Sequence, residues 1–355
     1  MMALAGYPLG LEFLFLDRDA RTPGGQVAPI LEGELSDRGL LGQLGERCEV
    51  LTFDWENIPV EALKNLPGKA RIAPPLRALG CAQDRLSEKR TFELLGIPTT
   101  RYAAVDSRAA LAAAVQTIGL PGVLKTRRMG YDGKGQFVIR AAADLDAAWA
   151  ALGSAPLLYE NLVPFDSEVS VIAVRGIDGK VAFYPLNLNV HREGILRITR
   201  APHGNAALAR QAQRAAKKLL EHFDYVGVLT IEFFVARGKL VANEMAPRVH
   251  NSGHWTIEGA ETSQFENHVR AISGMPLGST RARGHSAMIN LIGELPDRDT
   301  MLREPGLHWH DYGKAARPGR KLGHITLVEN SSQRRNLRAL KVLGRVDRAT
   351  WLAVR

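Results

Sequence analysis

Cysteine, long apolar runs and targeting segments are scarce or absent in this sequence. The chain of 355 residues holds only two cysteines, Cys48 and Cys81, which are too few for a disulfide framework and have no metal-ligand spacing. It contains no run of about 18 apolar residues, and its first residues lack the basic start and apolar core of a signal peptide. We therefore expect a cytoplasmic protein with no membrane partner.

Common nucleotide-binding and hydrolase motifs are also absent. The chain has no Gly-x-x-x-x-Gly-Lys-Ser/Thr, Gly-x-Gly-x-x-Gly, His-Glu-x-x-His or Gly-x-Ser-x-Gly sequence. These absences exclude a P-loop, a dinucleotide-binding glycine fingerprint, a zincin helix and a nucleophile elbow. Internal repeats and low-complexity tracts are missing as well.

What is present is the composition of a folded protein, with 45% apolar and 23% charged residues. The 46 Lys and Arg exceed the 37 Asp and Glu, which gives a net charge of +9 spread along the chain. We expect most of this charge to lie on ordinary solvated surface. A nucleic-acid-binding protein is the alternative from another class, but no basic motif interleaved with aromatic residues supports it.

The apolar pattern predicts a protein of mixed α/β and α+β class. The length of the chain suits two or three domains. We expect a domain boundary near residue 82. The first unit reads as a small parallel α/β domain, with a helix over 1–10 and strands at 11–16 and 50–53.

Later segments alternate between strand and helix patterns. Strands are expected at 123–126, 136–140, 157–160, 168–174, 181–184, 227–235, 239–244, 286–292 and 324–328. Helices are expected at 84–95 and 206–223, and in segments that run through Trp149 and Ile272. The strands at 123–126 and 136–140 form a hairpin with a long glycine-rich tip.

Polar residues follow the apolar run at 50–53 directly. In open α/β sheets, ligands bind beyond the carboxyl ends of the strands, so Glu56 and Asn57 are candidates for substrate contact. A plain helix cap before Pro59 explains the same residues equally well.

Two acidic residues occupy consecutive predicted strands, Glu232 and Glu244, and Asn243 stands beside the second. Mg²⁺ in proteins prefers one or two carboxylates together with phosphate oxygens, so these strands form a natural triphosphate site. The alternative is a solvated acidic face.

Lys125 ends an apolar strand directly before the glycine-rich loop Gly130-Tyr131-Asp132-Gly133-Lys134-Gly135. A lysine there can reach phosphates, and successive glycine N–H groups can enclose an anion, with Lys134 adding positive charge. An ordinary hairpin turn at Asp132-Gly133 is the alternative. Glu160 and Glu168 suit nucleotide contacts, although both fit surface acids too.

These residues together resemble an ATP-grasp enzyme. More narrowly, the strings at 127–136, 183–197 and 243–256 resemble the N5-carboxyaminoimidazole ribonucleotide synthetase family, and the likeness extends over nearly the whole chain. The resemblance implies an ATP-grasp fold with an N-terminal parallel α/β (pre-ATP-grasp) domain and a small β-rich C-terminal domain. By the same resemblance we expect a truncated pre-ATP-grasp domain at residues 1–82, an ATP-grasp domain at 83–278 with a lid lobe at about 98–165, and the C-terminal domain at 279–355. The resemblance also implies a homodimer without nucleic acid.

The family's reaction is a carboxylation in purine biosynthesis. ATP and bicarbonate form carboxyphosphate, whose carboxyl group passes to the amine of 5-aminoimidazole ribonucleotide, leaving ADP and phosphate. By resemblance, Mg²⁺ is held by Glu232 and Glu244. ATP is held by Arg85, Lys125, Gly130, Tyr131, Asp132, Gly133, Lys134, Gly135, Gln136, Glu160, Asn161, Leu162, Val163, Glu168, His191, Asn243 and Glu244.

Two further groups are candidates for the chemical step and for substrate binding. The catalytic candidates are Arg248, Tyr131, Asp132, Lys314 and Arg320. The substrate-binding candidates are Glu56, Asn57, His250, Asn251, Ser252, His254 and Lys321.

Several alternatives to these roles stay open. The loop after the Glu244 strand places Arg248 and the two histidines beside the γ-phosphate, although structural loop histidines or a zinc pair fit the same spacing. The Lys314–Lys321 segment fits a ribonucleotide phosphate clamp or a basic surface turn. The group that accepts the proton of the attacking amine is Asp132, a histidine or the released phosphate. The alternative enzyme is an ATP-grasp ligase that acts on another amine.

The chain departs from the family pattern at its start. Family members ordinarily begin with a strand and a Gly-Gly-Gly-Gln-Leu-Gly-type loop, whereas this sequence starts inside the following helix. Because the first strand of a parallel sheet is usually central, we expect unpaired strand edges and uncovered apolar surface in residues 1–82. From this we expect an insoluble or weakly active chain, and a misassigned start rather than a working truncation.

Overall fold

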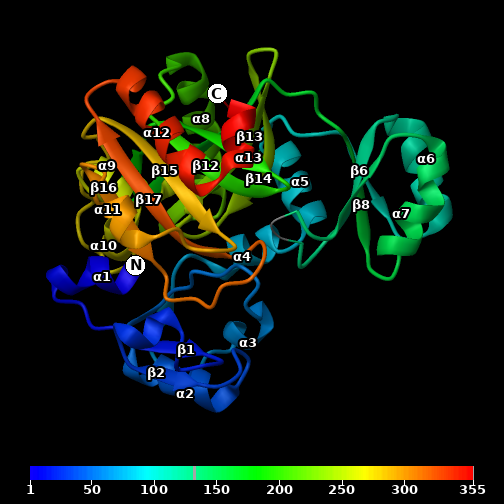
Figure 1. Ribbon diagram of the computed structural model, residues 1–355. Coiled ribbons are helices and arrows are strands. Elements are labelled where there is room, and N and C mark those ends of the chain that lie inside the picture. The colour runs from blue at the N-terminus through cyan, green and yellow to red at the C-terminus, as the bar shows by residue number, and fades with distance from the viewer. Residues whose placement is uncertain (131–132, 355) are drawn as a thin grey trace.

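The computed structural model describes residues 1–130 and 133–354. A large sheet with helices on both faces forms the main body, a smaller α/β lobe projects from it, and the N-terminal unit lies below (Figure 1). No helix in the described part of the chain is long and apolar enough to cross a membrane.

The main body is built on one nine-stranded sheet in which every pair of strands is antiparallel. Its strands in spatial order are β14 (Lys239–Ala246), β13 (Gly227–Ala236), β9 (Ser167–Arg175), β11 (Asn187–Arg192), β12 (Ile195–Ala201), β15 (His285–Ile292), β17 (Lys321–Glu329) and β16 (Leu307–Asp311), and β10 (Val181–Phe183) also pairs with β9. The C-terminal strands thus extend the sheet of the central unit.

Helix α8 (Ala206–His222) covers one face of this sheet. Asn205 caps its start by accepting hydrogen bonds from two backbone N–H groups. Leu208, Ala212 and Leu219 recur at helical spacing and are buried against the strands. The expected helix at 206–223 is therefore confirmed, and its apolar stripe explains why it packs where it does.

The remaining helices of the main body complete its three hydrophobic clusters. They are α5 (Arg85–Leu94), α9 (Thr256–Gly259), α10 (Gln264–Ile272), α11 (Arg298–Leu302), α12 (Ser332–Val346) and α13 (Arg348–Val354), with the 3-10 turn η4 (Asn251–Gly253). The sequence analysis did not predict β11, β12, β16, α11, α12 or α13, although α12 carries a clear amphipathic pattern with Ala339, Val342 and Leu343 buried.

The projecting lobe is a four-stranded antiparallel sheet with two helices. Its strands in order are β5 (Tyr102–Val105), β8 (Leu157–Asn161), β6 (Gly122–Thr126) and β7 (Gln136–Ile139), with helices α6 (Arg108–Ile118) and α7 (Leu145–Leu152) and the turn η3 (Ala142–Asp144). Strands β6 and β7 pair antiparallel, so the predicted hairpin is confirmed.

The N-terminal unit holds two separate parallel pairs of strands. The pairs are β1 (Phe15–Asp17) with β2 (Ile30–Glu32) and β3 (Val50–Leu51) with β4 (Arg71–Ile72), and the helices are α1 (Met2–Gly6), α2 (Arg38–Arg47), α3 (Val60–Lys64) and α4 (Leu76–Ala82), with turns η1 (Tyr7–Leu9) and η2 (Pro23–Gln26). The parallel pairing is as predicted. The expected strand at 11–16 is wrong in extent, because residues 11–14 have no ladder partner.

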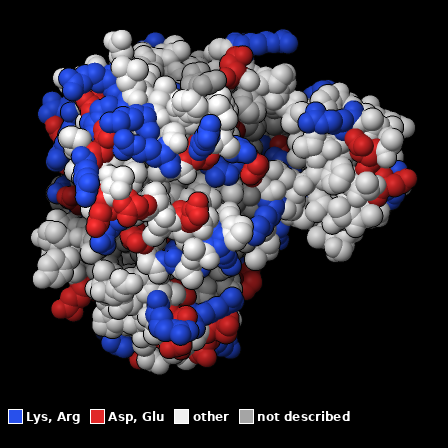
Figure 2. All heavy atoms as spheres, in the orientation of Figure 1, with Lys and Arg blue, Asp and Glu red and all other residues white. Residues whose placement is uncertain are grey.

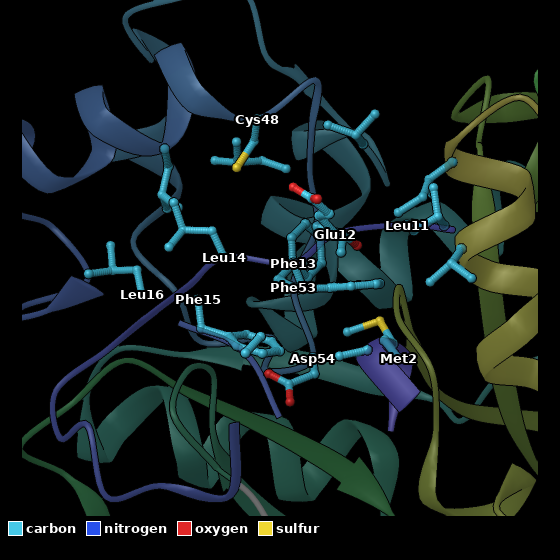
Figure 3. Close-up of a pocket in the computed structure, with 18 of the residues that line it drawn as sticks. Met2, Leu11, Glu12, Phe13, Leu14, Phe15, Leu16, Cys48, Phe53 and Asp54 are labelled. Atoms are coloured by element: carbon cyan, nitrogen blue, oxygen red, sulfur yellow. The ribbon is translucent and has the colours of Figure 1, made fainter. Parts of the chain in front are cut away.

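A cavity of about 1880 Å³ separates the two pairs (Figure 3). Phe13, Leu14 and Phe53 line it together with Met2, and residues of both β1 and β3 face it. Among the described residues, β1 and β3 each pair on one side only. The expected uncovered apolar surface and unpaired strand edges are therefore confirmed.

Positive charge gathers on part of the surface, over the C-terminal helix α12 (Figure 2). Acidic residues lie among it, because Lys341 and Arg338 pair with Glu304, and Arg334 pairs with Glu329. Helix α12 thus takes part in a network of ion pairs at the surface.

Candidate active site

Two carboxylates meet on neighbouring strands of the main sheet. In the β13–β14 ladder Glu232 stands directly opposite Glu244, so the two side chains share one face of the sheet. Burial raises the pKa of Glu232 to about 7, and the negative charges of Glu244 and Glu168 add to the rise while His191 opposes it. Two carboxylates held side by side on one face of a sheet suit a divalent cation.

The described residues hold no group of three or more His, Cys, Asp or Glu arranged to bind a metal by themselves. A Mg²⁺ ion at Glu232 and Glu244 would therefore depend on oxygen ligands from a bound phosphate, which is the usual way proteins bind this ion.

Glu168 and His191 form a second pair beside these carboxylates. The His191 Nδ1 lies 2.6 Å from the Glu168 Oε2, and its Nε2 lies 3.9 Å from the Glu232 Oε2. Burial lowers the pKa of His191, but the hydrogen bond to Glu168 and the charge of Glu232 outweigh it and raise the pKa to about 9. His191 is thus a cation that both acids share.

His250 approaches Glu232 from the loop after β14. The Ser252 N–H donates to the His250 Nδ1 at 3.3 Å, and the Ser252 hydroxyl lies 2.8 Å from the same atom. Burial lowers the pKa of His250 well below its usual value, and the charge of Arg248 lowers it further. A neutral imidazole that accepts at Nδ1 carries its proton on Nε2, which lies 3.6 Å from the Glu232 Oε1.

Ser252, Asn251 and His254 are already engaged with other protein groups. Ser252 is fully buried and hydrogen-bonds to Ser170, which favours a role in orienting His250 over direct substrate contact. The Asn251 amide pairs with the Asn290 amide at 2.7 and 3.0 Å. The Gln264 amide lies 3.2 Å from the His254 Nδ1, and burial lowers the pKa of His254 to about 3.

Arg248 joins the first unit to the main sheet. Its guanidinium contacts the Glu56 carboxylate, with Nε at 3.0 Å and Nη2 at 2.8 Å from Oε2. Gln83 holds this part of the first unit in place by donating to the carbonyls of Glu56 and Ile58, both at 2.7 Å. Two predicted site residues from distant segments are therefore in contact.

A small pocket of about 30 Å³ lies where the N-terminal unit, the lobe and the main sheet meet. Glu56, Asn57, Arg85, Gly130 and Glu244 are among the residues that line it. Arg85 Nη1 lies 3.3 Å from the Glu244 Oε2. Burial would raise the pKa of Glu244, but the charges of Arg85 and Lys125 lower it. This carboxylate is thus ionised beside cations that can also meet phosphate.

Lys125 and Glu160 form an ion pair within the lobe at 3.1 Å. The Glu160 carboxylate is only 2% exposed and also lies 3.3 Å from the ammonium of Lys89. The sequence analysis missed Lys89, although it follows Arg85 by four positions and so shares its helix face. The Glu160 side chain is thus enclosed between two lysines.

The residues after Glu160 are also tied to the lobe. The Asn161 amide oxygen accepts from the Arg101 N–H at 2.7 Å, and the Leu162 N–H donates to the Pro121 carbonyl at 3.0 Å. Val163 follows directly, beyond the end of β8. This segment links the lobe to the main sheet through β9.

The glycine-rich loop closes back on the main body. Gly133 and Gly135 have φ of +77° and +69°, and a Cβ at Gly133 would lie 2.8 Å from the Glu193 carbonyl oxygen, so glycine is required there. Gln136 begins β7 opposite Lys125. Gly130 and Lys134 are placed in the same loop, whereas Tyr131 and Asp132 lie outside the described residues.

The C-terminal candidates lie on one loop and the strand that follows it. Lys314 sits 5.4 Å from the Tyr312 ring centre, and the Arg320 guanidinium donates to the Ala315 carbonyl at 3.1 Å. Lys321 opens β17, and its positive charge helps to lower the pKa of His250. Of these three candidates, Lys321 is the one that acts on the charge of His250, whereas these contacts of Lys314 and Arg320 lie within the turn.

The large antiparallel sheet, the four-stranded lobe and the carboxylate pair between them define the ATP-grasp class of enzymes. The ATP-grasp domain family matches residues 90–265, the ribonucleotide synthetase preATP-grasp domain family matches residues 1–83, and the phosphoribosylaminoimidazole carboxylase C-terminal domain family matches residues 286–338.

Comparison with individual proteins identifies the family within this class. N5-carboxyaminoimidazole ribonucleotide synthase of Pseudomonas aeruginosa is 49% identical over 92% of this chain and 91% of its own length. A crystal structure of the synthetase from Thermus thermophilus superposes with a TM-score of 0.93 at 50% identity, covering 98% of this chain and 95% of that chain. The synthase of Aspergillus clavatus, in complex with ADP and 5-aminoimidazole ribonucleotide, has a TM-score of 0.90 at 30% identity over 98% and 95%.

The chain belongs to the N5-carboxyaminoimidazole ribonucleotide synthase family, and its activity is that of this ATP-grasp ligase of purine biosynthesis. The sequence-based expectation of family, fold and reaction is confirmed.

Proposed function

We propose that this chain binds ATP with Mg²⁺ between the lobe and the main sheet and uses it to carboxylate 5-aminoimidazole ribonucleotide with bicarbonate. The observation that carries the proposal is the register of β13 and β14, which sets Glu232 opposite Glu244 with Arg85 in contact. In this proposal the two carboxylates hold Mg²⁺, which supplies charge neutralisation at the transferring phosphoryl group.

The protein's part in phosphoryl transfer is to position groups and balance charge. Arg85 and Lys125 face the phosphates, and Glu168 with His191 borders the same crevice. No protein nucleophile is needed, because bicarbonate oxygen attacks the γ-phosphorus directly and ADP leaves. The carboxyphosphate formed is unstable in water, so the glycine-rich loop is proposed to exclude solvent.

Arg248 and the neutral His250 are proposed to bind bicarbonate and then the carboxyl group of the intermediate. The Nε2 of His250 lies 3.6 Å from the Glu232 carboxylate, and Arg248, two residues earlier in the same loop, supplies a guanidinium that contacts Glu56. Charge-assisted donors at this place stabilise the oxyanion that develops as the amine attacks. Asp132, a histidine or the released phosphate takes the amine proton.

The ribonucleotide is proposed to lie between the first unit and the C-terminal basic turn. Lys314, Arg320 and Lys321 supply positive charge for its phosphate. Glu56 and Asn57 approach from the other side. The bound 5-aminoimidazole ribonucleotide in the Aspergillus clavatus structure supports this assignment of the substrate.

The test is ADP release by the purified chain with MgATP and bicarbonate, with and without 5-aminoimidazole ribonucleotide. We expect release to require the ribonucleotide and to stop when excess EDTA removes Mg²⁺. Release that is independent of the ribonucleotide would contradict the substrate assignment, and full activity in EDTA would contradict the metal assignment.

We also propose a cytoplasmic homodimer. The family resemblance supports the dimer, and the free thiols of Cys48 and Cys81 suit a reducing compartment. Sedimentation equilibrium should report twice the chain mass of 38.8 kDa. A single species at the chain mass, at micromolar concentration, would contradict the dimer.

A further inference from the structure

Lys89 is a buried lysine with no assigned role in the reaction. It lies on α5 with 1% of its side chain exposed, and its ammonium donates to the Thr99 hydroxyl at 3.0 Å. It also donates to the backbone carbonyls of Ala242 and Asn243, at 3.3 and 2.9 Å. A buried ammonium loses its hydration, so these acceptors and a charge partner must compensate it.

The charge partner is Glu160, which Lys89 shares with Lys125. One carboxylate oxygen lies 3.3 Å from Lys89, and the other lies 3.1 Å from Lys125. The Thr100 hydroxyl donates to the first oxygen at 2.7 Å. Burial would raise the pKa of Glu160, but the charges of Lys125 and Lys89 keep it well below the usual value, so the group is an anion between two cations.

The three side chains differ in access to solvent, and this difference sets their roles. Lys89 and Glu160 are 1% and 2% exposed, whereas Lys125 is 12% exposed. Lys125 is therefore the member of the triad that an incoming anion can reach. A pair of Lys125 and Glu160 alone would be neutral, while the triad carries one net positive charge.

The same helix also holds the segment that carries the acidic pair. Along α5, Arg85 contacts Glu244, and the Glu88 carboxylate accepts from the Met245 N–H at 2.6 Å. Lys89 thus joins Glu160 of the lobe to the middle of β14. Lys89 therefore contacts both sides of the crevice, the lobe and the main sheet.

We propose that Lys89 is a positioning residue for the nucleotide: it neutralises and holds Glu160, which leaves the charge of Lys125 available for the phosphates. The inference rests on the proposed ATP site and adds a residue that does not touch the nucleotide. Lys89 acts through Glu160, and so its effect depends on the presence of that carboxylate.

The first test replaces the charge with an apolar chain of similar length, Lys89→Met. Calorimetric titration with MgADP should show a Kd raised about tenfold or more, within the usual range of site-to-site coupling. In turnover, KM for ATP should rise by a similar factor and kcat should change less than about threefold. The control is Arg90→Met, the exposed neighbour on α5, whose Kd should match the wild type.

The second test removes the carboxylate, with Glu160→Gln in a double-mutant cycle. If Lys89 acts through the charge of Glu160, adding Lys89→Met to Glu160→Gln should change the Kd for MgADP less than about threefold. The Glu160→Gln variant and the double variant both lack the buried carboxylate, so neither leaves it without a charge partner. The two can therefore be compared even if Lys89→Met alone does not fold. An effect of Lys89→Met as large in the Glu160→Gln background as in the wild type would overturn the proposal.

The binding measurements distinguish an error in the proposed ATP site from an error in the proposed role of Lys89. If the wild-type chain itself does not bind MgADP, the proposed ATP site is wrong. If the wild type binds but Lys89→Met binds equally well, the site stands and the positioning role of Lys89 is wrong.

Discussion

At the scale of single residues, the site consists of charged side chains that are paired with one another. Arg248 contacts Glu56 from 192 positions away, and His191 contacts Glu168. Paired in this way, the side chains hold fixed orientations and need little reorganisation during the reaction. The pairs also keep the buried charges from standing alone.

Arg248→Ala should lower kcat for ribonucleotide-dependent ADP release by about 10²-fold, because one preorganised cation beside the reacting groups is lost. Steady-state kinetics measures the change. Arg214→Ala, at an exposed position on α8, is the matched control and should leave kcat unchanged. A normal kcat in Arg248→Ala would exclude Arg248 from the chemical step.

At the scale of elements, helix α5 organises the crevice. Its N-cap Asp84 is buried, accepts from the Leu86 N–H at 3.0 Å, and pairs with Arg127 at 2.7 Å. Arg127 lies just before the glycine-rich loop, so one carboxylate fixes both the start of α5 and the base of that loop. Arg85 and Lys89 then project from the same helix into the site.

Asp84→Ala should lower the free energy of unfolding by about 3 kcal/mol or more, because it removes a helix cap and leaves a partly buried arginine unpaired. Urea denaturation provides the measurement. Asp37→Ala, at the exposed N-cap of α2, removes a cap without an ion pair and should cost clearly less. Equal losses in the two variants would show that the Arg127 pair adds nothing.

At the scale of the whole molecule, His268 connects the first unit to the main body. Its Nδ1 accepts from the Val228 N–H at 3.1 Å, and its Nε2 lies 2.8 Å from the Thr52 hydroxyl. The imidazole is fully buried on α10, and burial lowers its pKa to about 4. The neutral ring with its proton on Nε2 satisfies both contacts.

This arrangement predicts acid sensitivity. Above about pH 6.5 His268 is neutral in the folded and the unfolded chain, so its burial carries no protonation cost. As the pH falls from there toward 4, the unfolded chain binds a proton that the folded chain does not. Stability therefore falls by up to about 1.4 kcal/mol for each pH unit within this window.

Urea midpoints measured between pH 7 and 4.5 test this prediction. His268→Gln should flatten the fall in stability relative to the wild type, and His222→Gln, at an exposed position, should leave the fall unchanged. An identical pH dependence of wild type and His268→Gln would show that His268 does not titrate in this window.

The sequence by itself determined the features that depend on local order. The strands at 227–235 and 239–244 are joined by a short turn, which sets their pairing from Ala236 opposite Lys239 to Phe233 opposite Ala242. A β-bulge between Glu232 and Phe233 then places Glu232 opposite Glu244, and this shift does not follow from the turn. Helix α8 was also predictable, because a single apolar stripe specifies its buried face. The segments at 127–136, 183–197 and 243–256 indicated the family, and with it the reaction, in the same way. Each of them is a continuous stretch of sequence that can be recognised without the fold.

Only the tertiary structure decided which distant residues meet. It placed Glu56 on Arg248 and Lys89 on Glu160, and it merged the C-terminal strands with the central sheet. It also left β1 and β3 on opposite sides of a cavity rather than in one sheet. Such contacts depend on the packing of whole elements, and the residue types and local spacing of a chain do not specify which elements become neighbours.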